Sequence, residues 1–235
     1  MQLLRFYDEL ERLDLPVYSV KDVARILNKP MAYVHVYLSR LVADQKLVRI
    51  TRGRYSRPNV DPAVMATNVM CPSYLSFLAA LSYHQLTTQI PRTFHVVVLR
   101  QRAPIHIGPF TIVFVRFQKT NFFGYLRDAK VFIAEPEKVI ADGLYLPEYQ
   151  PIRESYGALS SRSLDLEKLA RYSSAFRVKA VQRRLGYLLE LANIGIPEML
   201  KRGRDGRKFS VLNPSLSPQG EKNKFWRLII NEVLE

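Results

Sequence analysis

The sequence has few residues with which to bind a metal or form a disulfide. Cys71 is the single cysteine and the four histidines are scattered. An internal disulfide, a cysteine-built zinc site and a paired-histidine metal site are therefore excluded, and no cofactor is predicted. We expect Cys71 to be a small buried residue, because free cysteines are among the most buried residue types.

Long apolar runs are also missing. No run reaches the roughly 18 apolar residues that a membrane-spanning helix requires. The N-terminal stretch MQLLRFYDELERL carries acids between its apolar positions, unlike a signal peptide. The sequence thus predicts no membrane partner and a protein that stays in the cytoplasm.

Catalytic motifs are absent as well. The chain has no glycine-rich phosphate loop, no GxSxG elbow and no pair of histidines at helical spacing. Glu135, Glu137 and Asp142 lie near one predicted helix start, where the helix dipole favours acids without any catalysis. His84 and His95 have apolar neighbours, which is typical of core histidines. We expect no enzymatic activity, although spacing alone leaves open a metal-dependent nuclease built from scattered carboxylates.

What the sequence has in excess is positive charge. Lys and Arg number 35 against 21 Asp and Glu, for a net charge of +14, so an anionic polymer is the first partner to consider. Two blocks hold most of the excess. Residues 1–60 contain 11 basic and 6 acidic side chains, and residues 171–227 contain 13 and 4. Within the first block, residues 19–57 carry nine basic side chains against two acidic ones.

The first 58 residues predict three helices and a basic hairpin. Apolar residues recur at helical spacing over residues 2–13, and Ser19 is a suitable N-cap for the helix VKDVARIL. A third helix is expected from Pro30 to about Asp44. Its inner face should hold Met31, Val34, Leu38 and Leu41. Its outer face should hold Ala32, Tyr33, His35, Val36, Ser39 and Arg40.

The stretch LVRITRGRYSRP, residues 47–58, predicts two strands joined at Arg52-Gly53. The order helix, helix, tight turn, helix, basic hairpin is typical of a winged helix-turn-helix domain. Its third helix would enter a DNA major groove, while the hairpin arginines would lie along a neighbouring backbone or minor groove. DNA binding is the leading prediction. A protein-docking module, with charges that only protect the hairpin edge, is the alternative.

Residues 58–72 contain three prolines and no clear period. We therefore predict a DNA-binding domain over 1–58, a linker over 59–72 and a larger domain over 73–235. The predicted fold class is α+β, with an N-terminal winged helix-turn-helix domain followed by a larger mixed α+β domain that has a mostly antiparallel sheet and C-terminal helices.

In the larger domain, a helix is expected from Ser73 to about Gln85, followed by a run of strands between residues 93 and 135. Helices should then follow from Pro136 onward. The last segment, KFWRLIINEVLE, is interpreted as a closing strand.

The second basic block borders a helix predicted over residues 178–194 and continues into the loop RGRDGRK. An amphipathic basic helix suits a nucleic acid or an acidic protein, or is only a solvated face. The members of this block are Arg171, Arg177, Lys179, Arg183, Arg184, Lys201, Arg202, Arg204, Arg207 and Lys208.

Several stretches together resemble the AbiEi-type antitoxins, the transcriptional regulators of AbiE toxin–antitoxin systems in phage defence. The matching stretches are YSVKDVARILN, VYLSRLVADQKLVRITRGRYSRP, PSYLSFLAALSYHQLTTQIP, IAEPEKVIADGLYLP and RRLGYLLELANI. They follow one another over nearly the whole chain.

The resemblance implies a bifunctional protein. Its winged helix would bind inverted repeats in the double-stranded DNA of its own operator and repress the operon. Its C-terminal domain would counteract a nucleotidyltransferase-like toxin, and whether the two proteins touch stays open. The predicted DNA contacts are Lys29, Tyr33, His35, Val36, Arg40, Arg49, Arg52 and Arg54. The basic block from Arg171 to Lys208 is the candidate antitoxicity or nucleic-acid surface.

Overall fold

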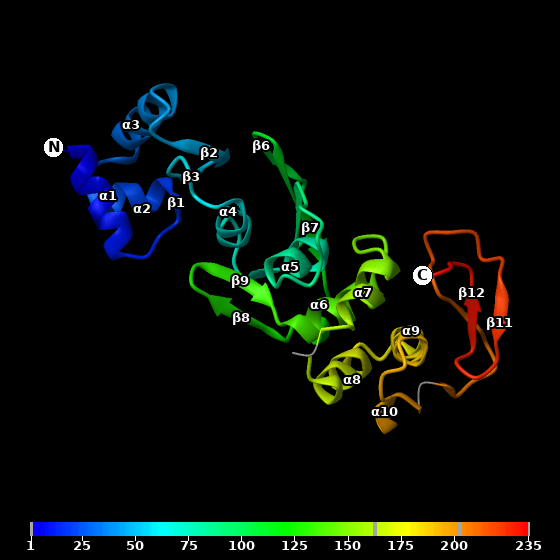
Figure 1. Cartoon of the computed structure of the whole chain (residues 1–235). Helices are drawn as coiled ribbons and strands as arrows, with labels where there is room; N and C mark the ends of the chain where they lie inside the picture. The colour runs from blue at the N-terminus through cyan, green and yellow to red at the C-terminus, as the bar shows by residue number, and fades with distance from the viewer. Residues whose placement is uncertain (1, 162–163, 202–203, 235) are drawn as a thin grey trace. The chain divides into compact units, whose positions relative to one another are not determined.

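The computed structural model describes residues 2–161, 164–201 and 204–234 and has a mixed α+β fold with mostly antiparallel sheets (Figure 1). This confirms the α+β class predicted from the sequence. The chain divides into two compact units. The first unit comprises Met1–Leu75, Arg92–Val115 and Arg127–Phe132, and the second comprises Ser76–Pro91, Arg116–Leu126 and Ile133–Glu235.

The first unit begins with three helices and a small sheet, drawn in blue and cyan in Figure 1. The elements are α1 (Gln2–Arg12), β1 (Val17–Ser19), α2 (Val20–Leu27), α3 (Met31–Ala43), β2 (Val48–Thr51) and β3 (Arg54–Ser56). Strand β3 lies between β1 and β2 and is antiparallel to both. Local signals set the limits of α2: Ser19 and Asp22 form a capping box, and Asn28 ends the helix in the left-handed conformation at φ 49°.

These helices and strands share one apolar core. Leu38 of α3 is buried with Phe6 of α1 and Tyr18 of β1, as helical spacing predicts for the inner face of α3. Met31 was expected on that face, but its side chain is 41% exposed. The prediction is wrong because Met31 is the first residue of α3, where the helix extends past the edge of the core.

A six-stranded sheet has the strand order β6-β7-β5-β4-β9-β8. Its strands are β4 (Ser73–Leu75), β5 (Thr93–Val98), β6 (Ile105–Ile107), β7 (Phe110–Arg116), β8 (Tyr125–Asp128) and β9 (Val131–Ala134). The pairs β4–β5 and β6–β7 are antiparallel. Ahead of β4, the stretch interpreted as a linker contains helix α4 (Pro62–Asn68), whose N-cap is Asp61.

The helix expected from Ser73 begins later than predicted. Ser73–Leu75 forms the buried strand β4, with Ser73 opposite Val98 and Leu75 opposite Val96. Helix α5 (Phe77–Tyr83) follows only after Ser76. The pairing with β5 therefore replaces the first turn of the expected helix.

The second unit is mainly helical and closes with a small sheet. Its further helices are the 3-10 helix η1 (Lys119–Asn121), α6 (Pro136–Tyr145), α7 (Ile152–Ala158), α8 (Leu166–Ala175), α9 (Lys179–Leu191) and α10 (Glu198–Lys201). The buried helix α6 packs against α5, α7, α8 and α9. The sheet has the order β10-β12-β11, formed by β10 (Ser210–Val211), β11 (Glu221–Asn223) and β12 (Leu228–Ile230). The expected closing strand is thus confirmed only over β12, and α7 was not predicted.

The helices are short. The two longest in the part of the chain that the structure describes, α3 and α9, have 13 residues each. Over residues 2–161, 164–201 and 204–234, no helix combines the length and the apolar character needed to cross a membrane.

Candidate nucleic-acid interface

The outer face of α3 is open to solvent along its length. All six residues expected there are exposed: Ala32, Tyr33, His35, Val36, Ser39 and Arg40. Tyr33 is 45% exposed and Val36 is 52% exposed, although the opposite face of the helix is closed by the core. His35, Val36 and Arg40 also border a shallow hollow of about 410 Å³. This face presents the ring of Tyr33, the methyl groups of Val36 and the guanidinium group of Arg40. Apolar and guanidinium groups of this kind can contact base edges in a major groove.

Aromatic contacts order the beginning of α3. The rings of Tyr33 and Tyr37 are stacked, with centroids 6.2 Å apart and planes at 12°, and Tyr37 meets Phe6 of the core edge to face. The ammonium nitrogen of Lys29 lies 5.9 Å from the centroid of the Tyr33 ring. Two predicted DNA contacts, Lys29 and Tyr33, are therefore brought together at the α2–α3 turn.

The β2–β3 hairpin carries the next group of predicted contacts. Arg49 and Arg52 are exposed and Arg54 is half-buried. Gly53 has φ +73°, which favours glycine, and a Cβ atom there would meet nothing within 4 Å. Arg49 is opposite Tyr55, and the register shifts before Thr51 pairs with Arg54.

Most of the basic side chains in residues 19–57 have no carboxylate partner among the described residues. Of the nine basic side chains in residues 19–57, two have a carboxylate partner among the residues that the structure describes. Lys46 lies 3.5 Å from Asp44, and Arg57 lies 2.7 Å from Glu11 and over the ring of Tyr7. The seven without one are Lys21, Arg25, Lys29, Arg40, Arg49, Arg52 and Arg54. The first unit therefore holds a positively charged hairpin, together with Arg40 on α3 and Lys29 just before that helix.

Two arginines of the second basic block are internal. Arg183 is 4% exposed and donates to the main-chain oxygen of Lys208 at 2.8 Å. Arg184 is 6% exposed and donates to the oxygens of Leu144 at 2.7 Å and Val211 at 3.0 Å. Their prediction as surface residues is wrong, because the chain that follows α10 covers this face of α9.

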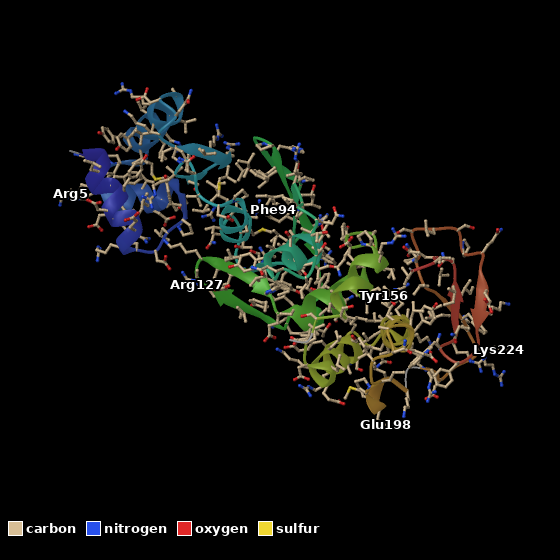
Figure 2. All side chains as sticks on the ribbon, in the orientation of Figure 1. Arg5, Phe94, Arg127, Tyr156, Glu198 and Lys224 are labelled. Atoms are coloured by element: carbon tan, nitrogen blue, oxygen red, sulfur yellow. The ribbon has the colours of Figure 1, made fainter. Side chains whose placement is uncertain are left out.

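The other members of the block differ in their surroundings. Arg171, Arg177, Lys179, Arg207 and Lys208 are exposed. Lys201 pairs with Glu198, which is labelled in Figure 2, and Arg204 lies 4.3 Å from the centroid of the Phe225 ring. Arg202 lies outside the described residues. Part of the charge of this block is therefore used inside the second unit.

The acids at the start of α6 are paired with Lys168. Its ammonium nitrogen lies 2.8 Å from Glu135 and 3.2 Å from Glu137. Partial burial opposes ionisation of Glu135, but hydrogen bonds from Lys168 and Tyr172 outweigh it and lower the pKa of this carboxyl group. Partial burial alone would lower the pKa of Lys168, whereas its bonds to the two carboxylates raise it to about 12. This arrangement stabilises the ionised pair and serves to hold α8 on α6.

Asp142 was grouped with these acids, but it lies in the second turn of α6 and not at the helix start. It forms a fully buried ion pair with Lys138 and accepts a hydrogen bond from Ser76 at 2.7 Å. Burial lowers the pKa of Lys138, and Asp142 opposes that effect. The rings around the Lys138 ammonium group are those of Phe117, Phe123 and Phe176. The helix-dipole explanation is therefore wrong for Asp142, which belongs to a buried ion pair.

The histidines and the cysteine do not form a reactive cluster in the described residues. The Nε2 atom of His84 lies 2.8 Å from the oxygen of Ala134, and burial lowers the pKa of His95 to about 4. Cys71, expected to be buried, is exposed because it lies in the loop between α4 and β4. Within the same residues, no three His, Cys, Asp or Glu side chains gather where they could hold a metal ion.

The structure also reveals basic residues that the sequence patterns did not indicate. Arg100 and Arg102 are exposed in the loop between β5 and β6, and β6 lies against hairpin strand β2 in the first unit. The pattern RQR in a strand-rich stretch was the only available signal.

No family model matches the chain, and a comparison with curated proteins finds no match.

Proposed function

We propose that the chain is a DNA-binding protein of the winged helix-turn-helix class. Support comes from the order α1, β1, α2, α3, β2, β3 and from the antiparallel arrangement β1-β3-β2. The observation that carries the proposal is the combination, in one unit, of an exposed α3 face and hairpin arginines that lack carboxylate partners among the described residues. A helix for the major groove and a cationic hairpin for the backbone are the two parts such a domain needs.

Within that class, the particular function is that of an autorepressor and antitoxin resembling the AbiEi type, acting in the cytoplasm. It binds the inverted repeats of its own operator and opposes a nucleotidyltransferase-like toxin without catalytic activity of its own. The second unit supplies the antitoxicity surface. Because Arg183 and Arg184 are internal, the exposed members of the predicted block are Arg171, Arg177, Lys179, Arg207 and Lys208.

The two parts of the DNA interface have different tasks. Arg49, Arg52 and Arg54 neutralise phosphates, which contributes affinity on any sequence and releases counterions. Tyr33, His35, Val36 and Arg40 on α3 contact base edges and supply the preference between sequences, while Lys29 reaches the backbone near the start of α3.

Fluorescence anisotropy at several salt concentrations tests this division. The probe is a labelled duplex carrying the DNA just upstream of the reading frame, compared with a scrambled duplex. Replacing Arg52 and Arg54 together by alanine should weaken binding to both duplexes and reduce the slope of log K against log salt by about 2, at ~0.9 per phosphate contact. Replacing Tyr33 or Arg40 by alanine should instead narrow the preference for the upstream duplex by about 1–3 kcal/mol.

The matched control replaces Lys119 and Arg153, two exposed cations of the second unit, by alanine and removes the same charge. This variant should keep the salt slope and the preference for the upstream duplex close to their wild-type values. Wild-type binding that does not respond to salt contradicts the proposal. DNA or RNA cleavage that requires added magnesium favours a nuclease instead.

Co-expression tests the antitoxin role. A nucleotidyltransferase-like reading frame adjacent to this gene should arrest growth when expressed alone, and this chain should restore growth. If the chain restores no growth in the presence of that toxin, only the DNA-binding part of the proposal stands.

A further inference from the structure

The first unit has a groove of about 640 Å³ beside the hairpin. Arg52 and Arg54 of the hairpin line one part of it, and Arg102 and Pro104 of the β5–β6 loop line another. Contact between strands β2 and β6 keeps these two parts together. The groove therefore joins the hairpin to a loop that lies about 50 residues further along the chain.

An adjoining hollow of about 380 Å³ extends the same surface and is lined by Arg100 and Arg102. The two hollows are thus bordered by Arg52, Arg54, Arg100 and Arg102, and their linings contain no Asp or Glu. None of the four arginines has an ion pair with the part of the chain that the structure describes. Four cations around one surface repel one another, and a bound anion would relieve that repulsion.

The loop that carries Arg100 and Arg102 is held in place. Gln101, between them, donates from its amide nitrogen to the main-chain oxygen of Phe114 in β7 at 3.0 Å. This bond ties the loop to the sheet and leaves the two flanking guanidinium groups exposed. Less conformational entropy is then lost when these groups bind a ligand.

We infer that Arg100 and Arg102 form a second phosphate-binding site for the DNA that the hairpin binds, an inference that rests on the proposed function. A planar guanidinium group donates two parallel hydrogen bonds to phosphate oxygens. The one aromatic ring in the linings of the two hollows, Phe114, is 4% exposed, so the surface offers no platform for stacking bases. The recognised group is therefore the backbone of a duplex, and the interface extends from the hairpin across β6 to this loop.

Salt titration of DNA binding tests the inference with the full chain. The probes are a mixed-sequence duplex of about three helical turns (~30 base pairs) and one of about one turn (~10 base pairs). Replacing Arg100 and Arg102 by alanine should reduce the salt slope on the longer duplex by about 2, at ~0.9 for each phosphate that is no longer neutralised. Arg102→Gln alone should reduce it by about 1. On the shorter duplex, which the α3 and hairpin contacts already cover, the effect should be much smaller.

The Lys119 and Arg153 double variant again controls for total charge, and replacing Arg100 and Arg102 by lysine keeps the charge but removes the guanidinium forks. The lysine variant should keep the salt slope and bind more weakly than wild type. If wild type binds DNA and the Arg52 and Arg54 variant behaves as proposed, but the Arg100 and Arg102 variant matches the control, the second phosphate site is refuted and the proposed function stands. If wild type shows no salt-dependent binding, both are refuted.

Discussion

Replacing Arg184 by alanine should destabilise the second unit strongly and leave DNA binding unchanged. The guanidinium group is buried and donates to the oxygens of Leu144 and Val211 at 2.7 and 3.0 Å. Leu144 lies in the last turn of α6, whose carbonyl groups have no partner within the helix, so Arg184 acts as a C-terminal cap for α6. A hydrogen bond from a charged donor contributes about 1.5–3 kcal/mol, and a buried acceptor left unpaired costs about 1–3 kcal/mol. We therefore expect a loss of about 3–5 kcal/mol in the free energy of unfolding.

The single tryptophan provides the assay. Trp226 is fully buried in the second unit, so its fluorescence during urea unfolding reports on that unit. Arg171→Ala removes the same charge from an exposed position and should change stability by no more than about 0.5 kcal/mol. Arg184→Lys offers one ammonium group in place of the fork and should lose roughly half as much as Arg184→Ala. An unfolding midpoint for Arg184→Ala equal to that of Arg171→Ala would refute the internal cap.

Two further predictions concern packing and pH. In Gly186→Ala the new Cβ would clash with the ring of Trp226, so we expect a loss of about 1–3 kcal/mol in the free energy of unfolding and a shifted Trp226 emission. Gly157→Ala in α7, where nothing lies within 4 Å, should gain about 0.5–1 kcal/mol, and similar effects of the two substitutions would contradict the close packing. Burial lowers the pKa of His95 from 6.5 to about 4, so the folded state favours the neutral ring. Its stabilisation is complete above pH 6.5 and is lost as the pH falls from 6.5 towards 4, by at most about 1.4 kcal/mol per pH unit. Urea unfolding followed by circular dichroism should therefore show that the free energy of unfolding of His95→Gln falls less steeply than that of wild type as the pH is lowered. A pH dependence equal to that of wild type would count against a contribution from His95.

The elements that the sequence predicted best depend on signals between near neighbours. Ser19 and Asp22 mark the start of α2 because the capping box needs only a spacing of three residues. Gly53 marks the hairpin tip because its positive φ suits glycine. Burial of Val34 and Leu38 follows from helical spacing. The exposed α3 face of the candidate site was predictable for the same reason, as the complement of a buried stripe.

Strand β4 shows where local signals are insufficient. A short apolar run fits a buried strand as well as a helix, and the periodicity of Ser73–Leu75 does not distinguish them. The deciding interaction is the pairing with Val96–Val98, more than 20 residues away in the sequence. The same limit hid the second part of the candidate interface. Arg100 and Arg102 lie near the hairpin because strand β6 contacts strand β2, and no local sequence pattern indicates that contact.

Total charge is therefore a poor guide to a binding surface unless the partners of each cation are known. By composition, the block over residues 171–227 is more basic than residues 1–60. Yet Arg183 and Arg184 give their hydrogen bonds to main-chain oxygens, and Lys201 pairs with Glu198. A guanidinium group inside the protein contacts no phosphate and releases no counterions from DNA. Several cations of that block are exposed as well, but Arg52, Arg54, Arg100 and Arg102 of the first unit line two adjoining hollows, and none of the four has a carboxylate partner among the described residues. The salt dependence of a DNA complex should accordingly follow the arginines of the first unit, although the sequence gives the second block the larger net charge.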